Sequence, residues 1–217
     1  LGDVYKRQDY GRALIVGEQT FGKGTVQQHR GLGRIYDLYD NPLGHVQFTI
    51  AKFYRINGGS TQHKGVVPDI LLPSAIEASD WGESQAESAL PWDSIARASY
   101  TTFGSTTQAV EQVDTLHKSR ISTDPEFAYI NDDITEYRKV KDRIFISLVE
   151  SERLAEKKEQ EDKELQRANE RLKRMGKEEV ASLDDLPEEF EETDAFLDEA
   201  AKITFDVIQT GKYAINS

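Results

Sequence analysis

Residues 13–28, A-L-I-V-G-E-Q-T-F-G-K-G-T-V-Q-Q, join two expected strands through a turn that carries a lysine. The continuous apolar run at residues 13–16, closed by Gly17, is typical of a short strand buried on both faces. A second strand is expected from Thr25 to Gln28. Lys23 lies between two glycines, which allow close approach of the backbone or a left-handed turn. The stretch therefore predicts β-structure with a distinctive lysine at a turn.

Further β-structure is expected downstream of this turn. Residues 46–50, V-Q-F-T-I, alternate apolar and polar side chains before Phe53 and Tyr54, which predicts a strand with one buried face. Residues 57–59, N-G-G, end that strand. Residues 66–70, V-V-P-D-I, supply a last extended segment with a proline at its edge.

The second half of the chain has helical periodicity. Asp124 and Pro125 are an N-cap and a first helical residue, and they open a helix that runs towards Lys141. Ser151 is expected to cap a long charged helix that ends at Gly176. A last helix should start near Asp194 and stop at Gly211. Its inward-facing residues are expected to be Leu197, Ala201, Ile203, Val207 and Ile208. These patterns predict an α+β protein.

Charge is unevenly distributed and excludes some functions. The chain carries a net charge of −12, and residues 1–90 hold 9 Lys/Arg against 10 Asp/Glu while residues 91–217 hold 18 against 29. Without a basic stripe, nucleic-acid binding is not expected, and anionic membranes are disfavoured. No apolar run reaches the length that spans a bilayer. The absence of cysteine excludes disulfides, thiolate metal ligands and a cysteine nucleophile.

The lysine turn is compatible with a phosphate-binding loop only in part. Gly17, Gly22 and Lys23 follow the G-x-x-x-x-G-K spacing after a strand. However, Gly24 stands where a serine or threonine hydroxyl would hold Mg²⁺, and the chain continues as a strand where a helix N-terminus would receive phosphate. Nucleotide binding is therefore the weaker interpretation.

A catalytic lysine is the stronger interpretation of the same turn. A lysine serves as a general base near neutral pH only where an apolar site favours its neutral form. Gly22 and Gly24 are expected to leave room for Lys23 to be enclosed, with Phe21 as apolar cover. Gln27, four residues later, is a candidate hydrogen-bond donor that orients the amine or the substrate. An exposed turn lysine is the plain alternative.

Two long stretches then resemble a known family. Residues 9–28, D-Y-G-R-A-L-I-V-G-E-Q-T-F-G-K-G-T-V-Q-Q, and residues 52–70, K-F-Y-R-I-N-G-G-S-T-Q-H-K-G-V-V-P-D-I, are similar to the carboxy-terminal processing peptidases, a family of serine proteases. Residues 89–93, A-L-P-W-D, and the acidic helical tail resemble the family's C-terminal helical region. The resemblance implies that Lys23 is the catalytic lysine of a Ser/Lys dyad and that Gln27 assists it.

The resemblance also implies parts that this chain does not contain. The family's nucleophilic serine lies some two dozen residues before the lysine, beside its oxyanion hole, and a PDZ domain lies further upstream. Here the first serine is Ser60, which is expected to be a turn serine. The chain is therefore expected to be inactive alone. His29, His45, His63 and His117 lack the spacing of a zinc site or a triad and are expected to be exposed or capping.

The resemblance gives a provisional domain layout. We expect an unmatched segment at residues 1–8, the C-terminal part of a protease core with a partial mixed β-sheet at 9–74, a linker at 75–95, and a C-terminal helical domain at 96–217. The implied activity is cofactor-independent endopeptidase cleavage near unstructured, apolar protein C-termini. The implied location is the periplasm, with at most peripheral membrane association. A regulatory adaptor is an expected partner, and a non-catalytic helical interaction module is the alternative function.

Overall fold

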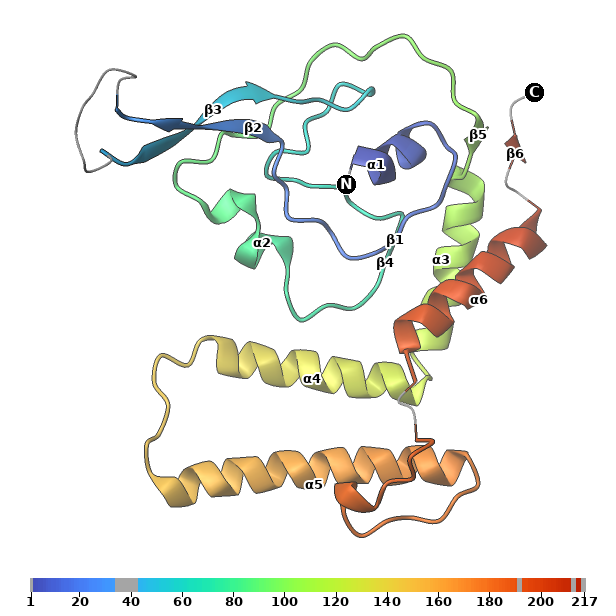
Figure 1. Ribbon diagram of the computed structural model, residues 1–217. Helices are drawn as coiled ribbons and strands as arrows, with labels where there is room; N and C mark the ends of the chain where they lie inside the picture. Colours follow the sequence, from blue (N-terminus) through green and yellow to red (C-terminus); the bar gives the residue numbers. More distant parts are fainter. Residues whose placement is uncertain (1, 34–42, 191–192, 212–213, 216–217) are drawn as a thin grey trace. The chain divides into compact units, whose positions relative to one another are not determined.

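The computed structural model describes residues 2–33, 43–190, 193–211 and 214–215. The chain is α+β, as predicted, with helices and short strands distributed along it (Figure 1). The helices are α1 Gly2–Asp9, α2 Ala78–Trp81, α3 Thr107–Ile121, α4 Pro125–Lys141, α5 Glu150–Arg174 and α6 Ala195–Thr210, with 3-10 turns η1 Glu83–Gln85 and η2 Leu183–Asp185. The strands are β1 Val16–Gly17, β2 Thr25–Gly31, β3 His45–Lys52, β4 Ile70–Leu71, β5 Gly104–Ser105 and β6 Ala214–Ile215.

The chain divides into two compact units. Unit 1 comprises Leu1–Thr135 together with Ala195–Ser217, and unit 2 comprises Glu136–Asp194. The final helix belongs to unit 1, where it packs against α3. These units do not coincide with the domain boundaries expected from the sequence, which remain predictions.

Within the described residues of unit 1, the strands form three two-stranded sheets. β1 and β4 are parallel, with Val16 opposite Ile70. β2 and β3 form an antiparallel hairpin, and β5 pairs antiparallel with β6. The partial mixed sheet expected from the sequence is therefore present as separate parallel and antiparallel pairs.

The β2–β3 hairpin projects from the rest of unit 1 (Figure 1). Val46, Phe48 and Ile50 are 40%, 38% and 54% exposed, so the expected buried face was wrong. Within the described residues, β3 pairs only with β2, and this two-stranded ribbon has no layer over these side chains. Alternation along a strand predicts which residues share a face, but burial requires a second layer against that face.

The core of unit 1 positions the lysine turn. Ile70 of β4, Val113 of α3 and Ile203 of α6 are almost completely buried, and Leu14, Val16 and Val207 pack against them. Full burial of such side chains contributes about 1.5–3 kcal/mol each. Strand β1 ends at Gly17, just before the lysine turn. The packing of Val16 therefore anchors the chain that leads to Lys23.

Helices α3 and α6 also bury charged residues that the sequence patterns did not predict. His117 and Glu199 are each 1% exposed, whereas Leu197 and Ile208 are 65% and 71% exposed. His117 Nδ1 lies 2.9 Å from Glu199 Oε1, and Arg120 Nη2 donates to the same oxygen at 2.7 Å. The prediction that His117 is exposed or caps a helix was therefore wrong. The prediction that Leu197 and Ile208 face inward was also wrong.

Arg120 extends this cluster to a second carboxylate. Its Nη1 donates to Asp206 Oδ2 at 2.6 Å. Hydrogen bonding to Glu199, followed in size by hydrogen bonding to Asp206, raises the pKa of the Arg120 guanidinium above its ordinary value against the opposing effect of burial. A buried carboxylate is tolerated when it is paired and hydrogen-bonded, which explains why α6 turns Glu199 inward.

Unit 2 contains the long helix. α5 begins at Glu150 with Val149 as its N-cap, so Ser151 lies in the first turn and is not the cap. Ala168 and Leu172 are buried on one face of α5. Asn169 fixes the returning chain, because its side chain donates to Val180 O at 3.0 Å and accepts from Val180 N at 2.8 Å. Among the helices of the described residues, none has the length and apolar character needed to cross a bilayer.

Candidate active site

The lysine turn, residues 18–24, lies directly against the segment that follows β3. Thr20 N donates to Val66 O at 3.1 Å, and Val66 N donates to Thr20 Oγ1 at 2.8 Å. A Cβ on Gly22, which has a φ of +95°, would lie 2.6 Å from His63 O, and a Cβ on Gly24 would lie 2.5 Å from Gln62 N. The two glycines around Lys23 are therefore required by contact with another backbone segment.

Lys23 itself forms an ion pair that the sequence did not predict. Its Nζ lies 3.4 Å from Glu83 Oε1, and its side chain is 41% exposed. The expected enclosure of Lys23 in an apolar site is therefore not found in this chain. Phe21 packs its ring against Trp81, with centroids 5.1 Å apart, instead of covering the amine.

A buried glutamine connects the lysine turn to Glu83. Gln62 is completely buried, and its Oε1 accepts from Gly24 N at 2.7 Å. Its Nε2 donates to Glu83 Oε1 at 3.2 Å. Because the backbone donor at Gly24 fixes the orientation of the amide, the NH₂ group of Gln62 is directed to the carboxylate.

A small pocket borders Lys23. It has a volume of about 90 Å³, and its lining includes Tyr5 of α1, Lys23, Phe53, Thr61 and Val66. Thr61 Oγ1 is buried without a hydrogen-bond partner among the described residues. The amine-bearing turn thus stands beside a partly apolar hollow, which is the setting that a small group of a bound substrate requires.

The second candidate residue, Gln27, lies away from this contact network. It is exposed on β2, and its Oε1 accepts from Gln47 Nε2 of β3 at 2.5 Å. Among the described residues, the Gln27 side chain therefore bonds to Gln47, whereas the Lys23 amine contacts Glu83. The functional roles of Lys23 and Gln27 remain predictions.

Ser60 was expected to be a turn residue, but it follows the turn and forms an isolated β-bridge with Tyr54. It is 3% exposed, and its Oγ accepts from Gln62 N at 3.0 Å. Its carbonyl accepts from Trp92 Nε1 at 2.9 Å. This serine therefore supports the position of Gln62. Within the described ranges, no group of three or more His, Asp or Glu side chains is placed to hold a metal ion.

Glu83 and Gln62 are the site residues that the sequence did not reveal. Glu83 lies in the polar stretch assigned to a linker, yet this stretch forms α2 and η1, and Glu83 N donates to Phe21 O at 2.9 Å. Trp81 was the available signal, because a large aromatic in a small, polar stretch usually packs against something.

Comparison with known proteins defines the class of the chain. The model of peptidase family S41 matches residues 4–72, which include Lys23, Gln27 and Gln62. The model described as the C-terminal domain of tail specific protease matches residues 76–209, more than half of the chain, and includes Glu83. Both matches point to a peptidase.

The chain belongs to the tail-specific protease family. It is 47% identical over 204 residues to the Tail-specific protease of Haemophilus influenzae, an alignment that covers 93% of this chain and 29% of that protein. It is 42% identical over 65 residues to the Carboxy-terminal-processing protease of Bartonella bacilliformis, covering 30% of this chain and 13% of that protein. The chain thus spans less than a third of the length of these curated relatives.

Proposed function

We propose that this chain is the C-terminal part of a serine-type endopeptidase that uses a Ser/Lys dyad, with Lys23 as general base. The observation that carries the proposal is the placement of Lys23 beside a pocket of about 90 Å³, on a turn held in place by Gln62 and Glu83. A catalytic group needs a fixed position next to the space that the substrate occupies.

In the proposed reaction, the serine oxygen attacks the scissile carbonyl while Lys23 Nζ takes the serine proton. Lys23 then gives that proton to the leaving amine as the C–N bond breaks, which leaves an acyl ester on the serine. Water hydrolyses the ester and regenerates the serine. Gln27 would orient the amine or the substrate, and no cofactor is required.

The nucleophile would come from a part of the protein upstream of this chain. Ser60 is a poor substitute, because it is buried and its hydroxyl accepts a hydrogen bond from Gln62 N. We therefore expect the 217-residue chain to be inactive by itself. The proposed substrates are proteins with unstructured, apolar C-termini in the periplasm, with a regulatory adaptor and, at most, peripheral attachment to the inner membrane.

The test compares this chain with a version extended upstream through the expected serine, using an unstructured protein with an apolar C-terminus as substrate. Cleavage by the extended form alone, abolished by Lys23→Ala, is the expected result. Cleavage by the 217-residue chain would contradict the missing nucleophile, and cleavage that persists in the extended Lys23→Ala variant would contradict the Ser/Lys assignment.

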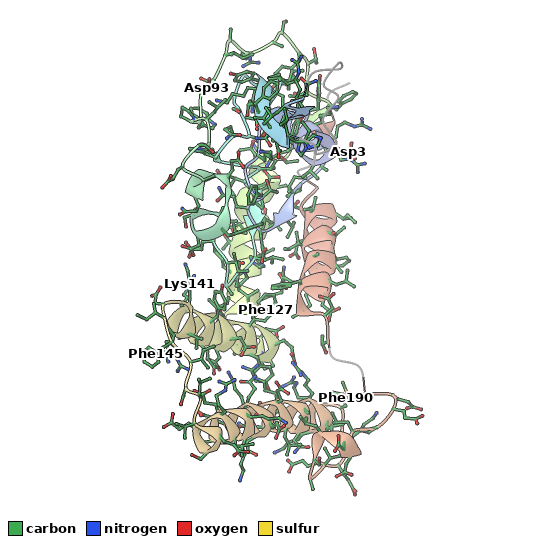
Figure 2. All side chains as sticks on the ribbon, turned by 60° about the vertical axis from the view of Figure 1, so that its left-hand side comes forward. Asp3, Asp93, Phe127, Lys141, Phe145 and Phe190 are labelled. Atoms are coloured by element: carbon green, nitrogen blue, oxygen red, sulfur yellow. The ribbon has the colours of Figure 1, made fainter. Side chains whose placement is uncertain are left out.

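A second candidate is a non-catalytic interaction module, and a feature of unit 2 favours it. The connection between α4 and α5 exposes Ile144, Phe145 and Leu148 by 96%, 74% and 96%, and Figure 2 labels Phe145 on this connection. Contiguous exposed apolar side chains often mark protein–protein contacts. Replacing Phe145 and Leu148 with serine should weaken binding of an adaptor protein without changing Lys23-dependent cleavage; unchanged binding would contradict this role.

A further inference from the structure

The carboxylate that contacts Lys23 comes from a different family region than the lysine. Lys23 lies in the segment matched by the S41 peptidase model, and Glu83 lies in the segment matched by the tail-specific protease C-terminal domain. Glu83 Oε1 is 3.4 Å from Lys23 Nζ. The C-terminal region thus contributes a charged group to the lysine turn.

Glu83 is held in place on several sides. Its side chain is 12% exposed, its backbone N donates to Phe21 O at 2.9 Å, and Gln62 Nε2 donates to its carboxylate at 3.2 Å. The contact between the Phe21 and Trp81 rings fixes the adjoining turn. These restraints fix the position of the Glu83 carboxylate, although its ion pair with the exposed Lys23 side chain is expected to contribute little to stability.

We propose that Glu83 is a positioning residue for Lys23, and that the C-terminal region completes the proteolytic site through it. This proposal rests on the proposed Ser/Lys function. When Lys23 Nζ takes the serine proton, it becomes an ammonium ion, and the Glu83 carboxylate stabilises that charge and fixes the direction of the amine. Glu83 keeps its own charge throughout, as the aspartate of a Ser-His-Asp triad does.

The experiment uses the protein extended upstream through its serine and compares Glu83→Gln with Glu87→Gln, a matched loss of charge at an exposed residue of the same segment. For Glu83→Gln, kcat should fall about 10²-fold, the cost of misplacing a catalytic group. KM should stay unchanged, because the proposed contact directs the amine and does not bind the substrate, whereas a general loss of structure would change both constants. Glu87→Gln should match the wild type.

Glu83→Asp keeps the carboxylate at a shorter reach, so it should recover part of the kcat that Glu83→Gln loses. Tyr5, which lines the pocket with Lys23, and His63, whose carbonyl lies against Gly22, are present in every variant. Differences in kcat between the variants therefore report on Glu83. An unchanged kcat in Glu83→Gln, or a loss of activity that lies in KM alone, overturns the proposal.

A second measurement needs no proteolysis. In the 217-residue chain, an amine-reactive reagent modifies lysines in their neutral form, and mass spectrometry reports the extent at Lys23. Glu83→Gln should raise the extent of modification at Lys23 at a fixed pH, because the amine loses its fixed partner, and equal modification in both proteins overturns the contact. If the extended Lys23→Ala variant still cleaves, the proposed function itself fails and Glu83 has no base to position, whatever the labelling result.

Discussion

Two cation–carboxylate clusters in unit 1 differ in their exposure to solvent. Lys23 and Glu83 form a single pair at the edge of a pocket, with the lysine side chain 41% exposed. His117, Arg120 and Glu199 form a cluster between two helices, with His117 and Glu199 each 1% exposed. The open pair is accessible to solvent from the side of the pocket. The closed cluster holds α3 to α6.

The closed cluster should give the larger loss of stability when one partner is removed. Glu199→Ala leaves Arg120 and His117 without their shared carboxylate, and we expect a loss of about 3–5 kcal/mol in the free energy of unfolding. Urea denaturation followed by circular dichroism measures it, with Asp198→Ala, an exposed neighbour on α6, as the control. A loss no greater than that of the control would contradict the role of the cluster.

The backbone of the open site should be more sensitive than its charges. Gly24→Ala would place a methyl group 2.5 Å from Gln62 N, so either the turn or the 61–65 segment must move. We expect a cost of about 1–3 kcal/mol in unfolding free energy. Gly31→Ala, at the end of the following strand β2, is the control, because the nearest neighbour of its added methyl group would be 3.8 Å away. Equal midpoints for the two variants would show that the close contact is not restrictive.

Removing the open charge pair should have a small effect on stability. Lys23→Met keeps the length of the side chain and removes its charge, and we expect a change of about 0–1 kcal/mol, the range for solvent-exposed pairs. Thermal unfolding of the 217-residue chain measures the change. A loss as large as that of Glu199→Ala would erase the distinction between the two clusters.

The smallest effect is expected at a third pair, Lys52 and Asp93. The hydrogen bond from Lys52 lowers the pKa of the Asp93 carboxyl below its ordinary 3.8, against a smaller effect of desolvation. A lowered folded-state pKa means that the contribution is present above pH 3.8 and is lost as pH falls through the folded-state value. Asp93→Asn should therefore reduce stability slightly at pH 6, and the reduction should shrink as the pH falls below 3.8 towards 2. An equal effect at both pH values would contradict the assignment.

Local patterns predicted the elements of this fold better than its contacts. Asp124 and Pro125 correctly predicted the start of α4, where Asp124 Oδ1 accepts a hydrogen bond from Glu126 N at 2.9 Å. Strand β2 begins at Thr25, as expected. Both signals are confined to a few neighbouring residues. The α+β class followed from such signals.

The partners in both charge clusters were missed because they are far apart in sequence. Glu83 lies 60 residues from Lys23, and Glu199 lies 82 residues from His117. A carboxylate on a polar face and one that turns inward to pair have the same local pattern. Only the packing of α3 against α6, or of η1 against the lysine turn, distinguishes them.

The projecting β2–β3 hairpin should make self-association of this chain depend on its concentration. Both outer edges of the ribbon are unpaired within the described residues, and Val46 and Ile50 remain exposed beside them. Open edge strands with apolar side chains pair with other strands, including those of identical molecules. Dilute samples should therefore remain dispersed, whereas crowding brings hairpins of neighbouring molecules together edge to edge.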